Sequence, residues 1–283
     1  MRYYIVDAFT STPFGGNPAG VVVLGASAEW PSEELTQHIA AALRYSATAL
    51  GIHNGTNEFT TRYFTPCSEV PVCGHATLAT FAVLSHEGVV NQGARCLNHT
   101  RAGDLEVSVG DNIMTQMAKP EVIDVVIDIR ELHDIMGIDP AAPQPSLPAE
   151  VVSTGLPDII MPVADVGTLN SLRPDMARLA ALSQRLNVTG VHAFALSTDG
   201  YTAHVRNFGP LYGIDEESAT GTANAALTHY LVRHGISSAP GECRFLQGEA
   251  MRRPSVITTV VASDGTIAVG GQCAIVAHGE LHT

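Results

Sequence analysis

A thiol, a glycine and an imidazole stand next to one another at Cys73-Gly74-His75, at the entry to a long apolar stretch that is typical of a helix. The start of a helix offers unpaired backbone N–H groups and partial positive charge, and a glycine there lets a ligand approach the backbone closely. A cysteine in such a place is expected to have a lowered pKa and to act as a base or nucleophile. His75 is a candidate proton carrier near neutral pH. The motif therefore suggests proton transfer.

A second motif of the same kind lies at Thr220-Gly221-Thr222. The acidic run Asp215-Glu216-Glu217 precedes it and supplies possible general acids or bases. Two such helix starts can hold one carboxylate-bearing substrate without a metal or cofactor, and no cysteine, histidine or acidic cluster has the spacing of metal ligands. We therefore expect a small carboxylic acid as the ligand, with no cofactor and no metal.

A purely structural interpretation of each motif stays open. Cysteine is among the most buried residue types, so Cys73 can be part of a core. A histidine is usually a satisfied core or surface residue, and an acidic run before a helix often only compensates the helix dipole. The recurrence of the glycine in both motifs favours the functional interpretation.

Both motifs belong to an internal repeat. Arg62-Tyr-Phe-Thr-Pro66 recurs as Arg206-Asn-Phe-Gly-Pro210 at an offset of 144 residues, and the two glycine motifs are 147 residues apart. The second copy therefore carries three extra residues in its Tyr212–Ala219 loop. Pseudo-symmetric halves usually bind their ligand at the shared interface, so we expect a cleft between them. An old duplication without a site between the halves is the alternative.

The elements that must position these motifs follow from periodicity and turn signals. Amphipathic helices are expected at 31–43 and 174–186, with Ser32 and Asp175 as caps. Apolar runs predict strands at Tyr3–Ala8, Gly20–Leu24, Glu58–Thr65 and Leu105–Val109 in the first half, at Val122–Ile127, Val151–Thr154, Ile159–Val163, Ala193–Ser197 and Thr202–Phe208 in the second, and at Gln272–His278 in either.

The pattern predicts an α/β (α+β) chain of two pseudo-symmetric domains, 1–118 and 119–269, with a boundary at Lys119-Pro120. The C-terminal strand within 270–283 can complete the first domain. The proline-rich segment 139–149 is expected to be a loop of the second domain. The helices that begin near His75 and Thr222 are expected to be the central, buried helices.

Composition excludes several classes of protein. The net charge of −13 disfavours nucleic-acid binding, and no run of 18 apolar residues predicts a membrane span. The N-terminus has no apolar h-region, so no signal peptide is expected. Five cysteines without a zinc spacing indicate a reduced, cytoplasmic protein. Gly15-Gly16-Asn17 leads into a strand rather than a helix, which argues against a dinucleotide-binding oxidoreductase.

Four further segments are informative when taken together: Asp7–Val21, Arg62–Pro66, Glu69–Ala79 and Gly213–Asn224. They resemble the phenazine-biosynthesis PhzF-like family, and the resemblance covers essentially the whole chain. The resemblance implies the diaminopimelate-epimerase-type fold, in which each domain wraps strands around a central helix and the active site lies between the domains. It implies a cofactor-independent isomerase that moves a proton on a small cyclic carboxylic acid such as dihydro-3-hydroxyanthranilate. We also expect a homodimer.

The same resemblance assigns site residues. His75 matches the active-site histidine of the family, Glu217 stands where the family usually has aspartate, and Thr222 stands where it usually has serine. Gly74 and Gly221 match glycines whose N–H groups hold the substrate. Asn17, Thr220 and Cys73 complete the expected site; Cys73 matches one cysteine of the related two-cysteine epimerases and Thr220 replaces the other, so a two-cysteine racemase is not expected.

Ala47 is the main departure from the family pattern. The family usually has Ser-Glu-Thr-Ala where this chain has Ser46-Ala47-Thr48-Ala49, and that glutamate shuttles the proton. A methyl group cannot carry a proton, and we expect Ala47 to leave room where a carboxylate would fit. Another base such as Cys73, Glu217 or His75 can replace it, the substrate can differ, the alanine can be an introduced substitution, or the chain is a catalytically silent small-molecule binder. We expect an isomerase or tautomerase, with the silent binder as the alternative.

Overall fold

The computed structural model describes residues 1–25, 28–143 and 145–282 and divides the chain into two compact units. The first unit comprises Met1–Gln116 together with Gly270–Thr283, and the second comprises Met117–Val269. The division lies close to the Lys119-Pro120 boundary expected from composition. Gln144, inside the proline-rich loop expected at 139–149, lies outside the described residues.

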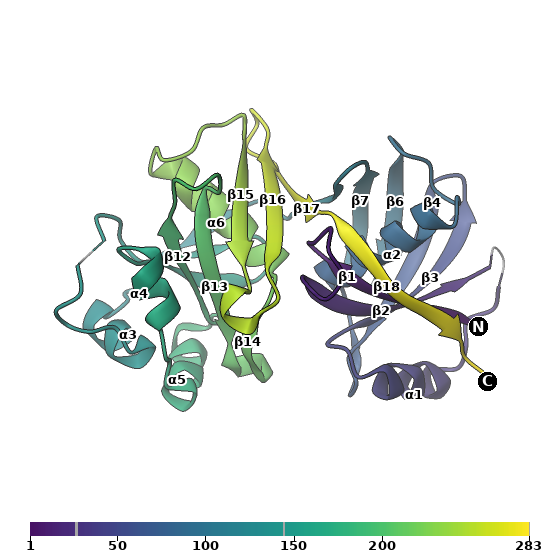
Figure 1. Cartoon of the computed structure of the whole chain (residues 1–283), viewed down its shortest axis with the longest axis horizontal. Coiled ribbons are helices and arrows are strands. Elements are labelled where there is room, and N and C mark those ends of the chain that lie inside the picture. Colours follow the sequence, from purple (N-terminus) through teal and green to yellow (C-terminus); the bar gives the residue numbers. More distant parts are fainter. Residues whose placement is uncertain (26–27, 144, 283) are drawn as a thin grey trace. The chain divides into compact units, whose positions relative to one another are not determined.

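The first unit is a curved sheet around one helix (Figure 1). Its strands run in the order β18, β1, β2, β3, β4, β6, β7, β8, with the short β5 paired to β4. Helix α2 packs against β1, β2, β3, β7, β8 and β18. The elements are β1 (Arg2–Ala8), β2 (Asn17–Leu24), α1 (Glu33–Leu43), β3 (Thr48–Gly55), β4 (Glu58–Phe64), β5 (Glu69–Val70), α2 (Gly74–His86), β6 (Arg95–Thr100), β7 (Gly103–Val109), β8 (Ile113–Gln116) and β18 (Cys273–Glu280).

The second unit repeats this arrangement. Its strands run in the order β9, β10, β11, β12, β13, β15, β16, with β14 paired to β13, and α6 packs against β10, β11 and β16. The elements are β9 (Glu121–Ile123), α3 (Ile129–Met136), β10 (Glu150–Ser153), β11 (Pro157–Pro162), α4 (Val166–Ser171), α5 (Met176–Leu186), β12 (Val191–Leu196), β13 (Ala203–Gly209), η1 (Pro210–Tyr212), β14 (Ile214–Glu217), α6 (Gly221–Arg233), β15 (Gly241–Gln247), η2 (Glu249–Met251) and β16 (Ser255–Val261). β17 (Ile267–Gly271) crosses the division of the chain.

The pairing of the strands confirms the internal repeat. From β1 to β7 the sheet alternates antiparallel and parallel pairs, and from β10 to β16 the same alternation recurs. The equivalent parallel pairs also begin at equivalent positions: Gly20 with Thr48 is the first pair of β2 and β3, and Ile159 with Val191 is the first pair of β11 and β12. Each parallel pair is joined by a connection that contains a helix: α1 and α5 join β2 to β3 and β11 to β12, and the central helices α2 and α6 join β4 to β6 and β13 to β15.

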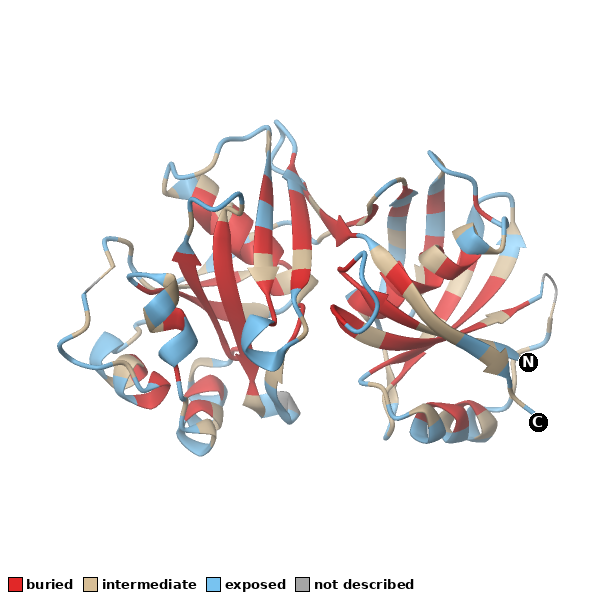
Figure 2. Ribbon diagram, viewed as in Figure 1, coloured by how far each residue is buried: buried red, intermediate tan, exposed pale blue. Residues whose placement is uncertain are grey.

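The two helices expected to be central are confirmed as such. Most residues of α2 and α6 are buried, from His75 to Leu84 in α2 and from Ala223 to Leu231 in α6. Figure 2 shows buried residues of α6 in red. A helix that is apolar on all sides is stable only inside a core. Helices α1, α3 and α5 bury one face each and cover the outer side of their sheets.

The expected caps are also confirmed. Ser32 Oγ accepts from the Leu35 backbone N–H at 3.2 Å, and an Asp175 carboxylate oxygen accepts from the Arg178 N–H at 3.1 Å. These bonds satisfy N–H groups that a helix start leaves unpaired.

One expected strand is wrong in length. The apolar run predicts a strand over Val122–Ile127, but β9 ends at Ile123, where its pairing with β10 ends at Val151. Val126 beyond it is 90% exposed. The chain then leads to Asp128, whose carboxylate caps α3.

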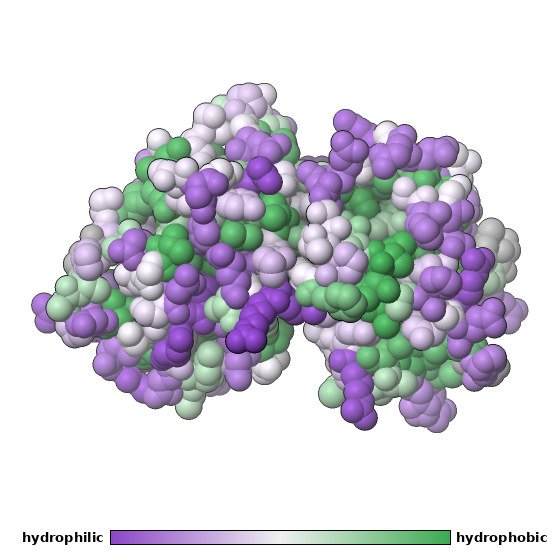
Figure 3. All heavy atoms as spheres, in the orientation of Figure 1, coloured by the Kyte–Doolittle hydropathy of each residue, from purple (hydrophilic) through white to green (hydrophobic). Residues whose placement is uncertain are grey.

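Polar and charged side chains cover much of the surface visible in Figure 3, in keeping with the acidic composition. Of the helices in the described ranges, none is long and apolar enough to cross a membrane.

Candidate active site

In the first unit, Cys73 and His75 lie in contact at the start of α2. Cys73 is the N-cap residue, and its Sγ lies 3.4 Å from Nδ1 of His75. On the other side of the ring, Nε2 lies 3.3 Å from the Ser46 hydroxyl oxygen. In the tautomer with its proton on Nδ1, His75 accepts from Ser46 and donates to Cys73. That direction of hydrogen bonding stabilises a Cys73 thiolate.

Burial sets the protonation state of His75. The side chain is 8% exposed, and burial lowers its pKa to about 4. The imidazole is therefore neutral near pH 7 rather than half protonated. A neutral imidazole can still relay a proton between Ser46 and Cys73, because one nitrogen donates while the other accepts.

Ala47 lies directly beside this group but inside the core. It is 1% exposed and packs in an apolar cluster with Val21, Ala76 and Ala79. The sequence suggested that Ala47 leaves open space where the family carries its glutamate. The structure shows the methyl group packed among apolar neighbours, and the adjacent Ser46 is the residue that contacts His75.

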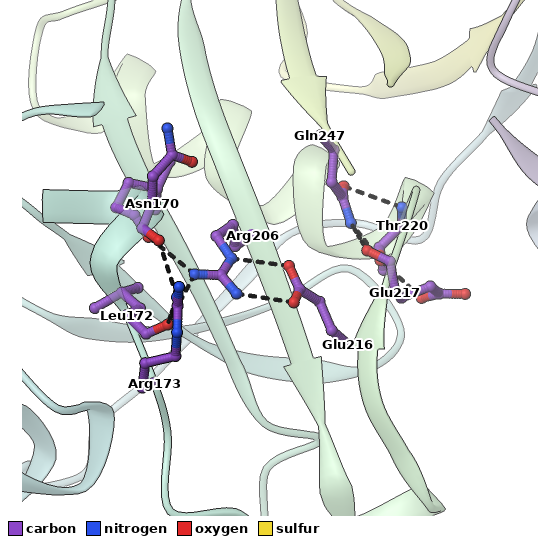
Figure 4. Close-up of polar contacts among 9 residues, drawn as sticks. Asn170, Leu172, Arg173, Arg206, Glu216, Glu217, Thr220 and Gln247 are labelled. Atoms are coloured by element: carbon purple, nitrogen blue, oxygen red, sulfur yellow. Dashed lines mark hydrogen bonds and ion pairs between the residues drawn. The ribbon is translucent and has the colours of Figure 1, made fainter. Parts of the chain in front are cut away.

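In the second unit, Glu217 is held at the start of α6. The Thr220 hydroxyl donates to a carboxylate oxygen of Glu217 at 2.7 Å (Figure 4). The buried side-chain amide of Gln247 donates to the Glu217 carbonyl at 2.8 Å and accepts from the Thr220 N–H at 3.2 Å. Asn224 donates to the same Gln247 oxygen at 2.9 Å. Thr220 thus holds the carboxylate of Glu217, and Gln247 holds its backbone.

The neighbouring Glu216 has a different role from the one expected. Its two carboxylate oxygens each accept a hydrogen bond of 2.8 Å from the Arg206 guanidinium (Figure 4). Arg206 also donates to the carbonyls of Leu169 and Leu172. Glu216 is thus part of an ion pair that anchors β14. Asp215 is exposed, whereas Glu217 is half-buried and belongs to the hydrogen-bond network at the start of α6.

An ion pair of the same kind occurs in the first unit. Arg62 donates two hydrogen bonds to Glu69, at 2.8 and 2.6 Å, and so anchors β5 shortly before Cys73. Arg62 and Arg206 are the paired arginines of the sequence repeat. Each unit therefore uses a bidentate ion pair, which is geometrically specific, to place the segment that enters its central helix.

The starts of α2 and α6 differ from every other described α-helix. The N-cap side chains of α1, α3, α4 and α5 all accept hydrogen bonds from the first turn. Neither Cys73 nor Thr220 forms such a bond, so these two helix starts have no side-chain cap among the described residues. Backbone N–H groups at an uncapped start are suited to bind an anion.

The remaining predicted site residues occupy the following places. Gly74 is exposed, and a Cβ there would meet no atom within 4 Å. Gly221 and Thr222 are half-buried in the first turn of α6. Asn17 is 4% exposed at the start of β2, paired with Ala8. Cys73, Gly74, His75, Asn17 and Ala47 thus belong to the first unit, and Glu217, Thr220, Gly221 and Thr222 to the second.

Three residues of the two networks were not predicted from the sequence: Ser46, Asn224 and Gln247. Ser46 adjoins Ala47, and Asn224 follows the second glycine motif, so position relative to a motif could have indicated both. Gln247 carries no local signal. It reaches Thr220 only because β15 lies beside β13 in the sheet.

A cavity of about 470 Å³ in the first unit lies near the other end of α2. Its lining includes His86, Asp111 and Cys273 but neither Cys73 nor His75. Within residues 1–25, 28–143 and 145–282, no group of three histidine, cysteine or acidic side chains could hold a metal ion.

A sheet wrapped around a central helix, present twice in one chain, is the diaminopimelate-epimerase-type fold. The chain belongs to the PhzC–PhzF family of phenazine biosynthesis-like proteins, whose family model matches residues 6–279. This confirms the resemblance drawn from the four sequence segments.

Individual relatives agree with this placement. The chain is 32% identical over 302 residues to the uncharacterized isomerase YddE of Escherichia coli O157:H7, covering 99% of this chain and 97% of that protein. The crystal structure of a PhzF-family phenazine biosynthesis protein from Bacillus anthracis superposes with a TM-score of 0.90 at 26% identity, covering 100% and 99% of the two chains. A probable proline racemase from Agrobacterium radiobacter K84 shares the fold alone, with a TM-score of 0.61 at 12% identity over 99% and 92% of the chains. The name of the Escherichia coli relative supports the isomerase class for this chain.

Proposed function

We propose that this chain is a cofactor-independent isomerase or tautomerase that moves a proton on a small cyclic or unsaturated carboxylic acid. The substrate carboxylate would bind to the backbone N–H groups at the starts of α2 and α6. Glu217 and the Ser46–His75–Cys73 group would carry the proton.

One observation carries this proposal: the two central helices are the ones without side-chain caps, and each has an ionisable group fixed beside its first turn. In α2 that group is Cys73, in contact with His75, and in α6 it is Glu217, held by Thr220. Uncapped N–H groups attract an anion, and a positioned acid or base moves a proton on it. A purely structural helix start would have gained stability from a cap, as the other four do.

The experiment is an isomerisation assay by NMR. Dihydro-3-hydroxyanthranilate and a panel of cyclic and unsaturated carboxylic acids are incubated with the protein after dialysis against a chelator. We expect one or more acids to be converted into an isomer, with the same rate before and after dialysis. Conversion that disappears on dialysis and returns with a metal ion would contradict cofactor independence.

The alternative function is a silent small-molecule binder, and Ala47 is the observation in its favour. If acids of the panel bind with heat changes in calorimetry but none is converted, the protein is a binder. The glutamate that the family resemblance assigns to proton transfer would then be the missing catalytic group.

A further inference from the structure

A residue in the first turn of α2, and one in the first turn of α6, hydrogen-bonds back to the N-cap carbonyl of its helix. In α2, the Thr77 hydroxyl donates to the Cys73 carbonyl at 2.8 Å, and the Thr77 N–H donates to the same oxygen at 2.9 Å. In α6, the Asn224 side-chain amide donates to the Thr220 carbonyl at 2.9 Å, and the Asn224 N–H does so at 3.3 Å. Both carbonyls therefore accept two hydrogen bonds, one of them from a buried side chain.

In the first unit, Thr77 is the last member of a buried chain of donors. A carbonyl oxygen can only accept, so the Thr77 hydroxyl proton goes to Cys73, and the Tyr63 hydroxyl donates to Thr77 at 2.6 Å. The amide of Asn98 donates to the Tyr63 oxygen at 3.1 Å and accepts from the Thr61 hydroxyl at 2.7 Å. All four side chains are buried. Every bond of this chain is directed toward the Cys73 carbonyl.

In the second unit, Asn224 ends a chain that is built from other residue types. Because Nδ2 of Asn224 donates to a carbonyl, its Oδ1 accepts, and Nε2–H of His192 donates to it at 3.4 Å. The amide of Asn207 then donates to Nδ1 of His192 at 3.3 Å. Burial lowers the pKa of His192 to about 4, so the ring is neutral near pH 7 and has one donor and one acceptor nitrogen. This chain is directed toward the Thr220 carbonyl.

The two chains occupy equivalent positions of the internal repeat. Tyr63 and Asn207 directly follow the paired arginines, and Thr77 and Asn224 each lie four residues after the N-cap residue of their helix. The residue types differ at both positions, whereas the hydrogen bond to the N-cap carbonyl is present in both units. The bond is therefore a shared feature of the two helix starts and does not depend on one type of side chain.

A hydrogen bond to the carbonyl four residues earlier is common for a buried threonine in a helix, so the Thr77 bond alone indicates no role. Thr36 in α1 and Thr80 in α2 form it as well, at 3.0 and 2.8 Å. Asn224 is a costlier way to make the same bond, because a buried amide needs a partner for each of its polar atoms. Its presence in α6 favours a role for the bond itself.

The peptide group that is held in this way carries the N–H available to a ligand. Because a trans peptide is planar, fixing the Cys73 carbonyl also fixes the direction of the Gly74 N–H, which is antiparallel to it. Gly74 is the first residue of α2, where the N–H has no partner within the helix, and a Cβ there would meet no atom within 4 Å. Hydrogen bonds to the carbonyl also polarise the N–H of the same peptide group and make it a stronger donor. The same reasoning applies to Thr220 and Gly221.

We propose that Thr77 and Asn224 are positioning residues for anion binding, each of which fixes and polarises the peptide group whose N–H binds an oxygen of the ligand. The donors are the N–H of Gly74 in the first unit and that of Gly221 in the second. This inference rests on the proposed function, which places the substrate carboxylate at these N–H groups. Thr77 and Asn224 act through the backbone and not by contact with the ligand, since both side chains are fully buried.

The first test needs no ligand. In the full chain labelled with ¹⁵N and ¹³C, the NMR signals of the Cys73 carbonyl carbon and the Gly74 amide report hydrogen bonding at that carbonyl. We expect both to move upfield in Thr77→Val and to stay near their natural positions in Thr77→Ser, which keeps the hydroxyl. The control Thr80→Val removes an equivalent bond, to Ala76, and should leave both signals in place. Signals that move no further in Thr77→Val than in Thr80→Val would overturn the inference for the first unit.

In the second unit, Asn224→Thr and Asn224→Val form a matched pair. Both variants lose the amide that contacts His192 and Gln247, but only threonine has a hydroxyl that can donate to the Thr220 carbonyl, as Thr77 does in α2. We expect the Gly221 amide signal to move upfield in the valine variant and clearly less in the threonine variant. Equal movement in the two variants would overturn the inference for the second unit.

A titration with benzoate, a simple cyclic carboxylate, separates this inference from the proposed function. We expect benzoate to move the Gly74 and Gly221 amide signals, with a Kd raised roughly three- to tenfold in Thr77→Val and in Asn224→Val, as the loss of one ordinary hydrogen bond would. Thr77→Ser and Thr80→Val should bind like the natural protein. An unchanged Kd in both valine variants would overturn the positioning role. If benzoate moves neither amide in the natural protein, the carboxylate site of the proposed function fails, while the signals without ligand still decide whether Thr77 and Asn224 hold the peptide groups.

Discussion

Arg206 and Glu216 form a bidentate ion pair with two hydrogen bonds of 2.8 Å, and Glu216 directly precedes Glu217 in the chain. The pair is largely buried, with side-chain exposures of 8% and 17%. It therefore fixes the backbone from which the Glu217 carboxylate projects toward Thr220.

Replacing Arg206 tests how much this ion pair stabilises the protein. Breaking a buried pair leaves an uncompensated charge and typically costs about 3–5 kcal/mol. We expect Arg206→Met to lower the free energy of unfolding by the lower part of that range, because Glu216 keeps some access to water. The double variant Arg206→Met/Glu216→Met should recover much of the loss in urea denaturation. A double variant no more stable than the single one would show that the pair itself is not the source.

Cys73 alkylation tests the hydrogen bond from His75. If His75 donates to the thiolate, His75→Leu should slow iodoacetamide labelling of Cys73 roughly tenfold, as a rise of one pKa unit would. His75→Asn is the matched control, because its amide can replace Nδ1–H. Mass spectrometry should be done in a Cys67→Ser background, since Cys67 is exposed. Equal rates in all three proteins would show that the contact does not activate the thiol.

Ala47→Glu tests whether proton transfer depends on position 47. Ala47 is 1% exposed in an apolar cluster, so a larger side chain should cost about 1–3 kcal/mol through overpacking. We expect Ala47→Glu to isomerise no faster than the equally large Ala47→Gln, because other groups carry the proton. A rate for the glutamate variant 100-fold above that of the glutamine variant would instead place the proton at position 47.

His204 predicts a pH-dependent stability. Burial lowers its pKa, but bonds to Glu249 at 2.6 Å and Asp199 at 2.8 Å outweigh burial and raise it overall. The stabilisation is therefore full below the ordinary histidine pKa and is lost as pH rises through the raised value. We expect the stability difference between the natural protein and His204→Gln to be larger at pH 5.5 than at pH 9 in thermal unfolding. A difference independent of pH would show that His204 packs without its charge.

The fold could be predicted from the sequence because the repeat consists of local patterns of apolar and polar residues. Periodicity marked α1 and α5, and the apolar runs after Gly74 and Gly221 marked the central helices. The end of β9 was missed because strand length depends on how far a partner strand extends, which is not a local property.

The site was predicted only where chemistry and spacing coincide. Cys73, His75, Glu217 and Thr220 stand in motifs, and the structure brings them into contact within their own units. Gln247 reaches these groups only through sheet pairing, so nothing in its flanking residues indicates it. The neutral state of His75 could not be predicted either, because it follows from burial.

The central claim is that this protein moves a proton on a small carboxylic acid, and deuterium incorporation tests it most directly. The acids of the panel are incubated with the protein in heavy water and examined by NMR and mass spectrometry. The account predicts exchange at one carbon of one or more acids, with rates lower by roughly 10²–10⁴-fold in Glu217→Gln and in Cys73→Ala. Exchange by the natural protein no faster than by the double variant Cys73→Ala/Glu217→Gln would contradict it.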